Sequence, residues 1–367
     1  MSFQKFLLVV FYILLIVLNY RGYIDKRTRT MLTLVTMVLS TFMLCSTNIA
    51  NLDWSETELD ISGYRSQFEK YDALEYDDFK MYYLFYGCMY LGQYFGLSFK
   101  LWWTIMSVLA MSVLFIACKI HGFSFNLFLA TFMAYYEIVF FSGFKFFYGF
   151  CFLLLAYGFL FSKNRKRQLL FALFTCIAGG FHMMYYFFLV LLIKPFKNPK
   201  FFVGIVVIIT IIFTVLMRVS GSALSFLTPF FDALDNDHIN KYTSGTVHSG
   251  FYVALFIHSA VVYVAYTIRK FKIMEGTCSD DTDTLYYTVL LSLVFCPFYA
   301  VSLTFMRLIT AFSLVVVTAS SGLLADSYKS RVVCVRMSLL IVFAFYLMRI
   351  AFGGFFNSSV IPYFDVL

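Results

Sequence analysis

Long apolar runs separated by short loops rich in lysine and arginine dominate this chain. A run of about 20 apolar residues is long enough to cross the hydrocarbon core of a bilayer as a helix. The sequence is 61% hydrophobic and 13% charged, and this charged fraction is about half that of an average soluble domain. These features predict an all-α, polytopic membrane protein: a single integral membrane domain over residues 1–367, with about 10 full transmembrane helices plus re-entrant or interfacial helices.

The cysteines and the net charge argue against several classes of site. The chain has eight cysteines and no CxxC pair, so the sequence predicts neither a disulfide framework nor a metal site, and no cofactor is expected. The formal net charge of +8 could indicate a nucleic-acid partner. However, the basic residues lie in short loops between apolar runs, which is the pattern of cytoplasmic loops in membrane proteins. We therefore expect the partner to be a lipid bilayer and not nucleic acid.

The basic loops also predict a topology. If all of them are cytoplasmic, an even number of crossings must separate each loop from the next. The loops comprise residues 21–29, 163–167, 194–200, 269–272 and 329–336. Five apolar stretches lie between the first two loops, so one of them should not cross. The best candidate is 81–97, because it is short and carries three glycines and five tyrosines, which favour the membrane interface.

The apolar stretch 169–193 lies between two basic loops and holds Gly179-Gly180-Phe181-His182 at its middle. Two half-helices of about 12 residues, roughly 18 Å each, would be too short to cross a bilayer. We expect them to enter from the cytoplasm, break at the glycines and return, which leaves His182 near mid-membrane. An ordinary span with one misplaced basic loop is the alternative.

This topology places two long loops, 51–80 and 218–250, on the outer face, which is periplasmic or extracellular. The loop 51–80 holds nine of the chain's 20 acidic residues, interleaved with aromatic residues. Carboxylates accept hydrogen bonds from hydroxyls, and aromatic rings pack on the apolar faces of sugars, so this loop is a candidate sugar-binding surface. A carboxylate in it could also deprotonate a sugar hydroxyl. A solvated acidic face is the simpler interpretation of any single residue.

Two titratable residues lie within apolar sequence. Lys145 separates two apolar runs, and His182 lies inside a third. A lysine at the centre of a membrane helix costs roughly 2.5–3.5 kcal/mol, so such residues are rare unless they line a polar cavity. Lys145 and His182 are therefore the first functional candidates. Glu137, about two helical turns before Lys145, is either a structural ion-pair partner for a lysine or a second candidate base.

Five short motifs resemble, in the same order, elements of the EpsG-like membrane proteins. They are Asp60-Ile61-Ser62-Gly63-Tyr64 with Phe68, Ser142-Gly143-Phe144-Lys145-Phe146, Ala178-Gly179-Gly180-Phe181-His182-Met183, Phe305-Met306-Arg307-Leu308 and Pro362-Tyr363. The EpsG-like proteins are bacterial polysaccharide repeat-unit polymerases of the Wzy type, which act in the synthesis of O-antigen (lipopolysaccharide), capsule or exopolysaccharide. Lys145 stands where this family usually has arginine, and lysine offers a point charge in place of a bidentate contact.

The resemblance implies a glycosyltransferase that moves a glycan from undecaprenyl diphosphate onto the terminal sugar of another lipid-linked repeat unit. The active site would face the periplasm or outside of the bacterial cytoplasmic (inner) membrane. Such a reaction needs cations for the leaving diphosphate and a base for the attacking hydroxyl. The expected diphosphate-binding residues are Lys145, Arg307 and Arg65; the candidate bases are Asp60, which is preferred, His182 and Glu137; the expected substrate contacts are Tyr64, Lys241 and Tyr242.

The partners that the resemblance implies are the undecaprenyl-diphosphate-linked oligosaccharide and, in the same pathway, a chain-length regulator and a flippase. The alternative function is a transporter or flippase of lipid-linked oligosaccharides, which would also need an outer cavity with buried cations. Many transporters are built from repeated halves, and this sequence shows no internal repeat. That difference and the acidic outer loop favour catalysis.

Overall fold

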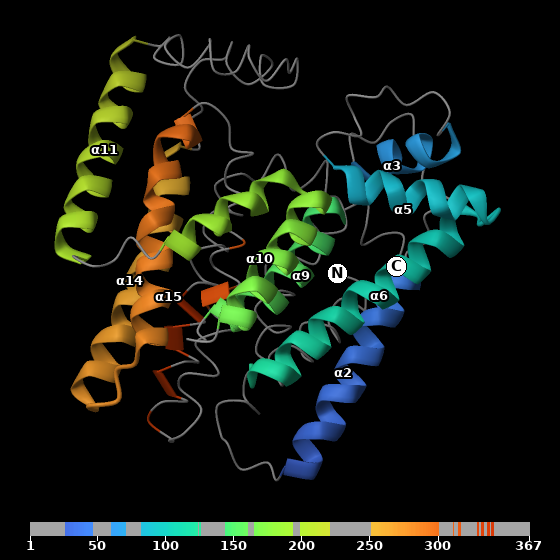
Figure 1. The fold of residues 1–367 in the computed structure, drawn as a ribbon, viewed down its shortest axis with the longest axis horizontal. Coiled ribbons are helices and arrows are strands. Elements are labelled where there is room, and N and C mark those ends of the chain that lie inside the picture. Colours follow the sequence, from blue (N-terminus) through green and yellow to red (C-terminus); the bar gives the residue numbers. More distant parts are fainter. Residues whose placement is uncertain are drawn as a thin grey trace, which may run out of the picture. The chain divides into compact units, whose positions relative to one another are not determined.

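The computed structural model describes residues 26–46, 60–70, 82–123, 125, 144–160, 165–193, 199–220 and 251–300, together with a few single positions between 311 and 340. All regular structure in these ranges is helical, which confirms the all-α class for this part of the chain (Figure 1). Contacts divide the chain into two compact units. Unit 1 comprises Met1–Ile193, Val317–Ser338 and Gly353–Leu367; unit 2 comprises Lys194–Val316 and Leu339–Phe352. The predicted single integral membrane domain stays a prediction.

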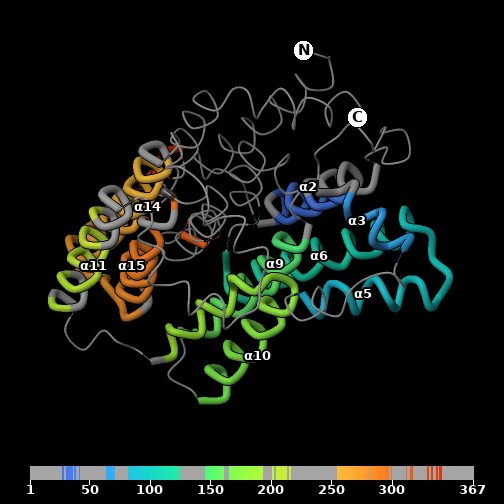
Figure 2. Tube along the Cα trace, turned by 90° about the horizontal axis from the view of Figure 1, so that it is seen from above, coloured from blue at the N-terminus to red at the C-terminus, as the bar shows by residue number. Residues whose placement is uncertain are grey.

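Unit 1 is a group of helices connected by aromatic contacts. Its elements are α2 (Lys26–Ser46), α3 (Asp60–Glu69), α5 (Tyr83–Tyr94), α6 (Phe99–His121), α9 (Phe144–Leu160), α10 (Arg165–Phe181) and the 3₁₀ helix η2 (Met183–Ile193). Helix α9 packs against both α6 and α10, α5 packs against α10, and the short α3 lies over α5 and α6 (Figure 2). This arrangement brings the segment 60–70 next to the start of α9.

Helix α6 is, among the described residues, the helix that is both long enough and apolar enough to cross a membrane. It has 23 residues, begins at the N-cap Ser98, whose hydroxyl accepts a hydrogen bond from the Leu101 N–H, and ends at Gly122 in the left-handed conformation. Helix α5 has 12 residues, which span roughly 18 Å at 1.5 Å per residue, less than the roughly 30 Å of a hydrocarbon core.

The chain leaves α10 at His182 and turns back against it as η2. The Tyr186 ring of η2 lies so close to Gly179 that a Cβ at Gly179 would be 2.5 Å from it, and a Cβ at Gly180 would be 2.7 Å from Leu84 of α5. The helix ends at Phe181, one residue after the glycine pair at which the sequence predicts a break. The two glycines are helical, and they serve instead as close contact points for η2 and α5.

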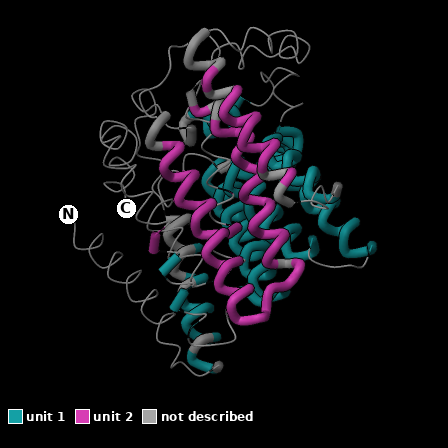
Figure 3. The backbone as a smooth tube through the Cα atoms, turned by 90° about the vertical axis from the view of Figure 1, so that its left-hand side faces the viewer, with its two compact units in different colours: residues 1–193, 317–338, 353–367 teal, residues 194–316, 339–352 magenta. Residues whose placement is uncertain are grey.

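Unit 2 contains α11 (Pro199–Ser220), α14 (Phe251–Met274), α15 (Asp280–Ser292) and the 3₁₀ helix η4 (Leu293–Ala300). Figure 3 shows its long helices side by side. The buried His258 of α14 has polar partners on both ring nitrogens: Nδ1 is 2.9 Å from the Tyr299 hydroxyl and Nε2 is 2.7 Å from the Ser292 hydroxyl. Because both ring nitrogens are satisfied in the unit's interior, His258 is a structural residue that ties α14 to α15 and η4.

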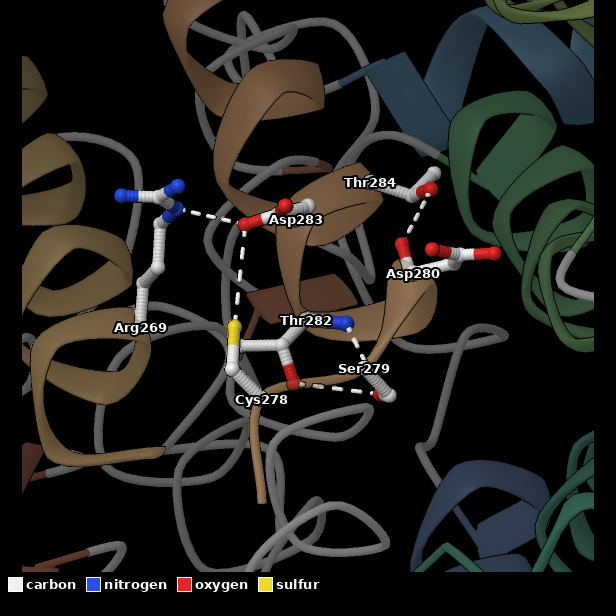
Figure 4. Close-up of polar contacts among 7 residues, drawn as sticks. All are labelled: Arg269, Cys278, Ser279, Asp280, Thr282, Asp283 and Thr284. Carbon is white, nitrogen blue, oxygen red and sulfur yellow. Dashed lines mark hydrogen bonds and ion pairs between the residues drawn. The ribbon is translucent and has the colours of Figure 1, made fainter. Parts of the chain in front are cut away.

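The turn between α14 and α15 is fixed by polar contacts (Figure 4). The Arg269 guanidinium donates to the Asp283 carboxylate at 2.6 Å, and the Ser279 hydroxyl caps α15 by accepting from the Thr282 N–H. The Cys278 thiol donates to the same Asp283 oxygen at 3.8 Å. Desolvation of the thiol and, second, the Asp283 carboxylate raise the pKa of Cys278 above its usual value.

This turn provides a native probe of the predicted topology, because Cys278 is the exposed cysteine among those the structure describes. Since residues 269–272 are predicted to be cytoplasmic, we expect a membrane-impermeant maleimide to label Cys278 in inverted vesicles and not in intact cells. The raised pKa means less thiolate at neutral pH, so the labelling rate should be slower than for a free cysteine and should keep rising above pH 9. Asp283→Asn should speed labelling at pH 7.5.

The matched control for this experiment is Cys278→Ser, which removes the labelled site and leaves the other cysteines. Labelling that persists in Cys278→Ser belongs to another cysteine and is subtracted. Efficient labelling of Cys278 in intact cells would place the turn on the outer face and would contradict the predicted topology.

Candidate functional site

Lys145 is held among aromatic rings at the start of α9. Its Nζ lies 4.4 Å from the ring centroid of Tyr82, 4.5 Å from Tyr86, 5.1 Å from Tyr64 and 5.2 Å from Phe85. It also donates a hydrogen bond of 2.8 Å to the Tyr86 hydroxyl. We call these four rings the aromatic cage. The cage rings come from α3, from α5 and from the residue that precedes α5, so the site forms only when α3, α5 and α9 pack together.

The aromatic cage stabilises a positive charge in apolar surroundings. A cation over an aromatic face gains about 0.5–1 kcal/mol when exposed and about 2 or more when desolvated. The four rings and the tyrosine hydroxyl are all neutral groups, so these contacts favour the charged ammonium and add no negative charge to the site. A cation held in this way can attract an anion more strongly than it would in water, because the surroundings screen it less.

The cage is itself built on a buried core. Phe85 and Tyr86 are fully buried, and Tyr64 meets Phe85 edge to face, with 5.2 Å between the ring centroids. Helix α3 is further anchored by Phe68, whose ring lies 5.2 Å from that of Trp102 in α6. Because the rings pack in fixed orientations, the position of Lys145 is set by the core of unit 1.

Hydrogen bonds reinforce the attachment of α3. The Tyr86 hydroxyl donates to Gln67 Oε1 at 3.5 Å, and the Gln93 amide donates to the Phe68 carbonyl. The chain of donors from Lys145 through Tyr86 to Gln67 thus joins α9, α5 and α3. A displacement of α3 would therefore change the contacts of Lys145.

His182 contacts the same cage from another side. Its ring centroid lies 5.5 Å from that of Tyr82 and 5.4 Å from that of Phe146, and the residue is almost completely buried. Tyr82 therefore contacts both Lys145 and His182. Lys145 and His182 are 37 positions apart in the sequence, and both contact the Tyr82 ring.

The other predicted site residues fall into two groups. Arg65 pairs with Glu69 of its own helix at 2.7 Å, and Tyr64 contributes its ring to the cage. Asp60 is the first residue of α3, one helical turn before Tyr64. Glu137, Lys241, Tyr242 and Arg307 lie outside the described residues, as does the Asp60 side chain. Their predicted roles stay predictions.

Three cage residues were not among the predicted site residues: Tyr82, Phe85 and Tyr86. The sequence assigns the tyrosines of 81–97 to the membrane interface, yet Tyr86 is buried inside unit 1. A signal was present, because positions 82, 85 and 86 recur at the i, i+3 and i+4 spacing of one helix face. Nothing in the sequence indicates that this face meets a lysine 59 positions later.

The closeness of α9 to α10 and η2 depends on Gly149, one turn after Lys145. A Cβ at Gly149 would lie 2.8 Å from the Ala178 carbonyl oxygen and would overlap the Tyr185 ring. Tyr185 cannot move away freely, because it is buried and its hydroxyl donates to the Phe146 carbonyl at 2.7 Å.

We therefore expect Gly149→Ala to destabilise the protein by about 1–3 kcal/mol, the usual cost of overpacking, and to lower activity by displacing Lys145. Thermal unfolding in detergent and polymer formation in cells would measure the two effects. The control is Gly204→Ala in α11, where an added Cβ meets nothing within 4 Å. Unchanged stability and activity in Gly149→Ala would show that this close approach does not position the site.

The described residues form helices, the sequence is strongly apolar, and Lys145 lies among aromatic rings. These features fit the class of membrane-associated helical proteins. The model of the EpsG family matches residues 36–364, and the chain therefore belongs to the EpsG family. This confirms the resemblance carried by the five motifs. Membership indicates polysaccharide biosynthesis and a polymerase-type glycosyltransferase activity in general. Neither a curated protein nor a solved structure matches the chain.

Proposed function

We propose that this protein is a polysaccharide polymerase that transfers a glycan from undecaprenyl diphosphate onto the terminal sugar of another lipid-linked repeat unit. The observation that carries the proposal is the cation of Lys145, held in an aromatic cage that His182 also contacts. Family membership supports the general activity. The donor and the acceptor are those that the resemblance to the EpsG-like polymerases implies, and the Lys145 cation fits the diphosphate of that donor.

The cation fits the leaving group of this reaction. As the bond between the anomeric carbon and the diphosphate oxygen breaks, both bonding electrons remain with the diphosphate, whose negative charge increases. A preorganised cation in surroundings of low dielectric stabilises such developing charge, and the loss of one comparable contact typically costs 10²- to 10³-fold in rate. In this proposal Lys145 provides that contact together with Arg307 and Arg65.

The attacking hydroxyl must lose a proton as its oxygen bonds to the anomeric carbon. We assign this proton to Asp60, which begins α3 one turn before the cage residue Tyr64. Positions 60 and 64 are four apart, and such positions share a helix face. His182 is the second candidate base, since it contacts the cage directly, and Glu137 is the third.

The proposal includes the membrane arrangement in which this chemistry takes place. The protein would cross the bacterial inner membrane about 10 times, with the site, the loop 51–80 and the loop 218–250 facing the periplasm or outside. Lys241 and Tyr242 of the second loop would contact substrate. The product would be O-antigen, capsule or exopolysaccharide, and a flippase and a chain-length regulator would act in the same pathway.

The test is to incubate the purified protein in detergent with a lipid-linked repeat unit and to separate the products by size. A ladder of multiples of the repeat unit, with release of undecaprenyl diphosphate, would support the polymerase. Movement of the glycolipid across a liposome bilayer with no ladder would refute it and would favour the flippase, with Lys145 as a cation of the transport path.

A further inference from the structure

The exposed face of α5 carries a row of tyrosines. Tyr83, Tyr90 and Tyr94 are 46%, 50% and 73% exposed. They follow the i, i+7, i+11 spacing of one helix face. Tyr186 of η2 extends the row at one end, because its hydroxyl donates to that of Tyr83 at 3.2 Å. We call Tyr83, Gly87, Tyr90, Tyr94 and Tyr186 the tyrosine strip.

Gly87 makes a notch in the middle of the strip. It occupies the i+4 position after Tyr83, and a Cβ built on it would meet nothing within 4 Å. No close contact among the described residues therefore requires this glycine, unlike Gly92 of the same helix, whose Cβ would lie 2.5 Å from Trp102. The space between Tyr83 and Tyr90 is open to an external group.

The strip differs chemically from the exposed faces of the long helices α6 and α11. The large exposed side chains of α6 and α11 are almost entirely aliphatic: Leu101, Ile105, Val108, Leu109, Ile116 and Ile120 on α6, and Ile205, Val207, Ile208, Ile211, Ile212 and Val215 on α11. Such faces suit acyl chains. The exposed face of α5 instead presents aromatic rings that carry hydroxyls, with Leu91 and Phe95 beside them. A hydroxyl on an aromatic ring suits a partner that is itself apolar on its faces and polar at its edges.

The strip is also uncharged and joined to the proposed catalytic site. Helix α5 has no charged residue, so its exposed face offers neither attraction to a polyanion nor repulsion of a neutral molecule. The buried side of the same helix contributes Phe85 and Tyr86 to the cage around Lys145. A ligand on the strip would thus lie within one helix diameter, about 10 Å, of the cation site.

From these observations we propose that the tyrosine strip binds the uncharged saccharide part of the substrate or the growing glycan, with sugar rings packed on the tyrosines and one ring seated at Gly87. The inference rests on the proposed function, since it names the part of the substrate that the polymerase would hold outside the diphosphate site. The spacing of 11 residues from Tyr83 to Tyr94 gives the strip a length of roughly 17 Å, enough for several sugar rings.

Binding can be measured without turnover. The probe is the oligosaccharide released by mild acid from the cell's own surface polysaccharide, titrated into purified full-length protein and followed by saturation-transfer NMR. We expect Tyr90→Ala and Gly87→Leu each to weaken binding roughly tenfold, as truncation or obstruction of a central aromatic contact does. The matched controls are Tyr263→Ala, an exposed tyrosine of α14, and Gly204→Leu, an open glycine of α11. Equal affinity in all four variants would overturn the proposal.

A second arm tests whether the strip faces lipid instead. A nitroxide is attached to Tyr94→Cys in an otherwise cysteine-free protein in nanodiscs. We expect a water-soluble nickel complex to relax this nitroxide. Preferential relaxation by oxygen would place the strip in acyl chains and overturn the proposal. The two hypotheses can fail separately. Oligosaccharide binding that depends on the strip, with no ladder, would refute the polymerase alone. A ladder with binding that does not depend on the strip would refute the strip alone.

Discussion

Lys145→Met is expected to reduce polymer formation by at least about 100-fold, the cost typical of removing one preorganised contact to developing charge. Methionine is close to lysine in length and lacks the charge, so it leaves the aromatic cage filled. The helix around it should therefore fold, and the loss should appear in the rate of the ladder assay and not in the melting temperature. Lys145→Ala should lose activity to the same extent, with some additional loss of packing among Tyr64, Tyr82 and Tyr86.

Lys145→Arg is the conservative variant that separates charge from size. A guanidinium also stacks on aromatic faces and binds phosphate, with two donors in place of one, so this variant should retain activity. Lys119→Met, which removes an exposed lysine at the far end of α6, is the matched control and should behave as the wild type. If Lys145→Met kept the wild-type rate, the lysine would only fill the space between the cage rings and would not bind the diphosphate.

Asp60→Asn is expected to have a comparable effect, about 10²- to 10⁴-fold, because general base catalysis usually contributes in that range. Asparagine preserves the shape of the side chain and cannot accept the proton of the attacking hydroxyl. His182→Gln provides the comparison. It keeps a hydrogen-bonding group beside Tyr82 and removes the imidazole, so under the proposed assignment it should cost less than Asp60→Asn.

The comparison is decided by the pH dependence of the initial rate in the ladder assay. If Asp60 is the base, Asp60→Glu should retain part of the activity and shift the acidic limb of the profile, while His182→Gln should leave that limb in place. A larger loss in His182→Gln, together with removal of the limb near the pKa of a histidine, would transfer the role of base to His182 and leave Asp60 as a substrate contact.

The helical class, the two candidate residues Lys145 and His182, and the family could be predicted because each depends on local sequence. Apolar runs long enough to bury every backbone polar group as helix predict the all-α class, and the described residues confirm it. A lysine and a histidine inside apolar sequence are costly, so Lys145 and His182 were recognisable as site candidates before their neighbours were known. The order of short motifs identified the family, which the match over residues 36–364 confirms.

The glycine pair shows what local interpretation gives and what it misses, since α10 ends one residue after the pair, close to the predicted break. Gly179 and Gly180 predict a break because glycine weakens a helix. In the structure both are helical, and the absence of a side chain allows η2 and α5 to approach α10. A glycine that weakens one helix is indistinguishable in the sequence from a glycine on which a second helix packs.

Local sequence therefore accounts for the helical class, the family and the two costly polar residues. Packing between helices determines the rest: Tyr82 contacts both of them, Tyr86 turns inward to Lys145 while Tyr83 and Tyr90 face outward, and His258 is satisfied by Tyr299 and Ser292. The physical reason is that hydropathy reports the average polarity of a segment. Which rings meet a given cation depends on the rotation and crossing of helices far apart in the chain, and those are set by packing in three dimensions.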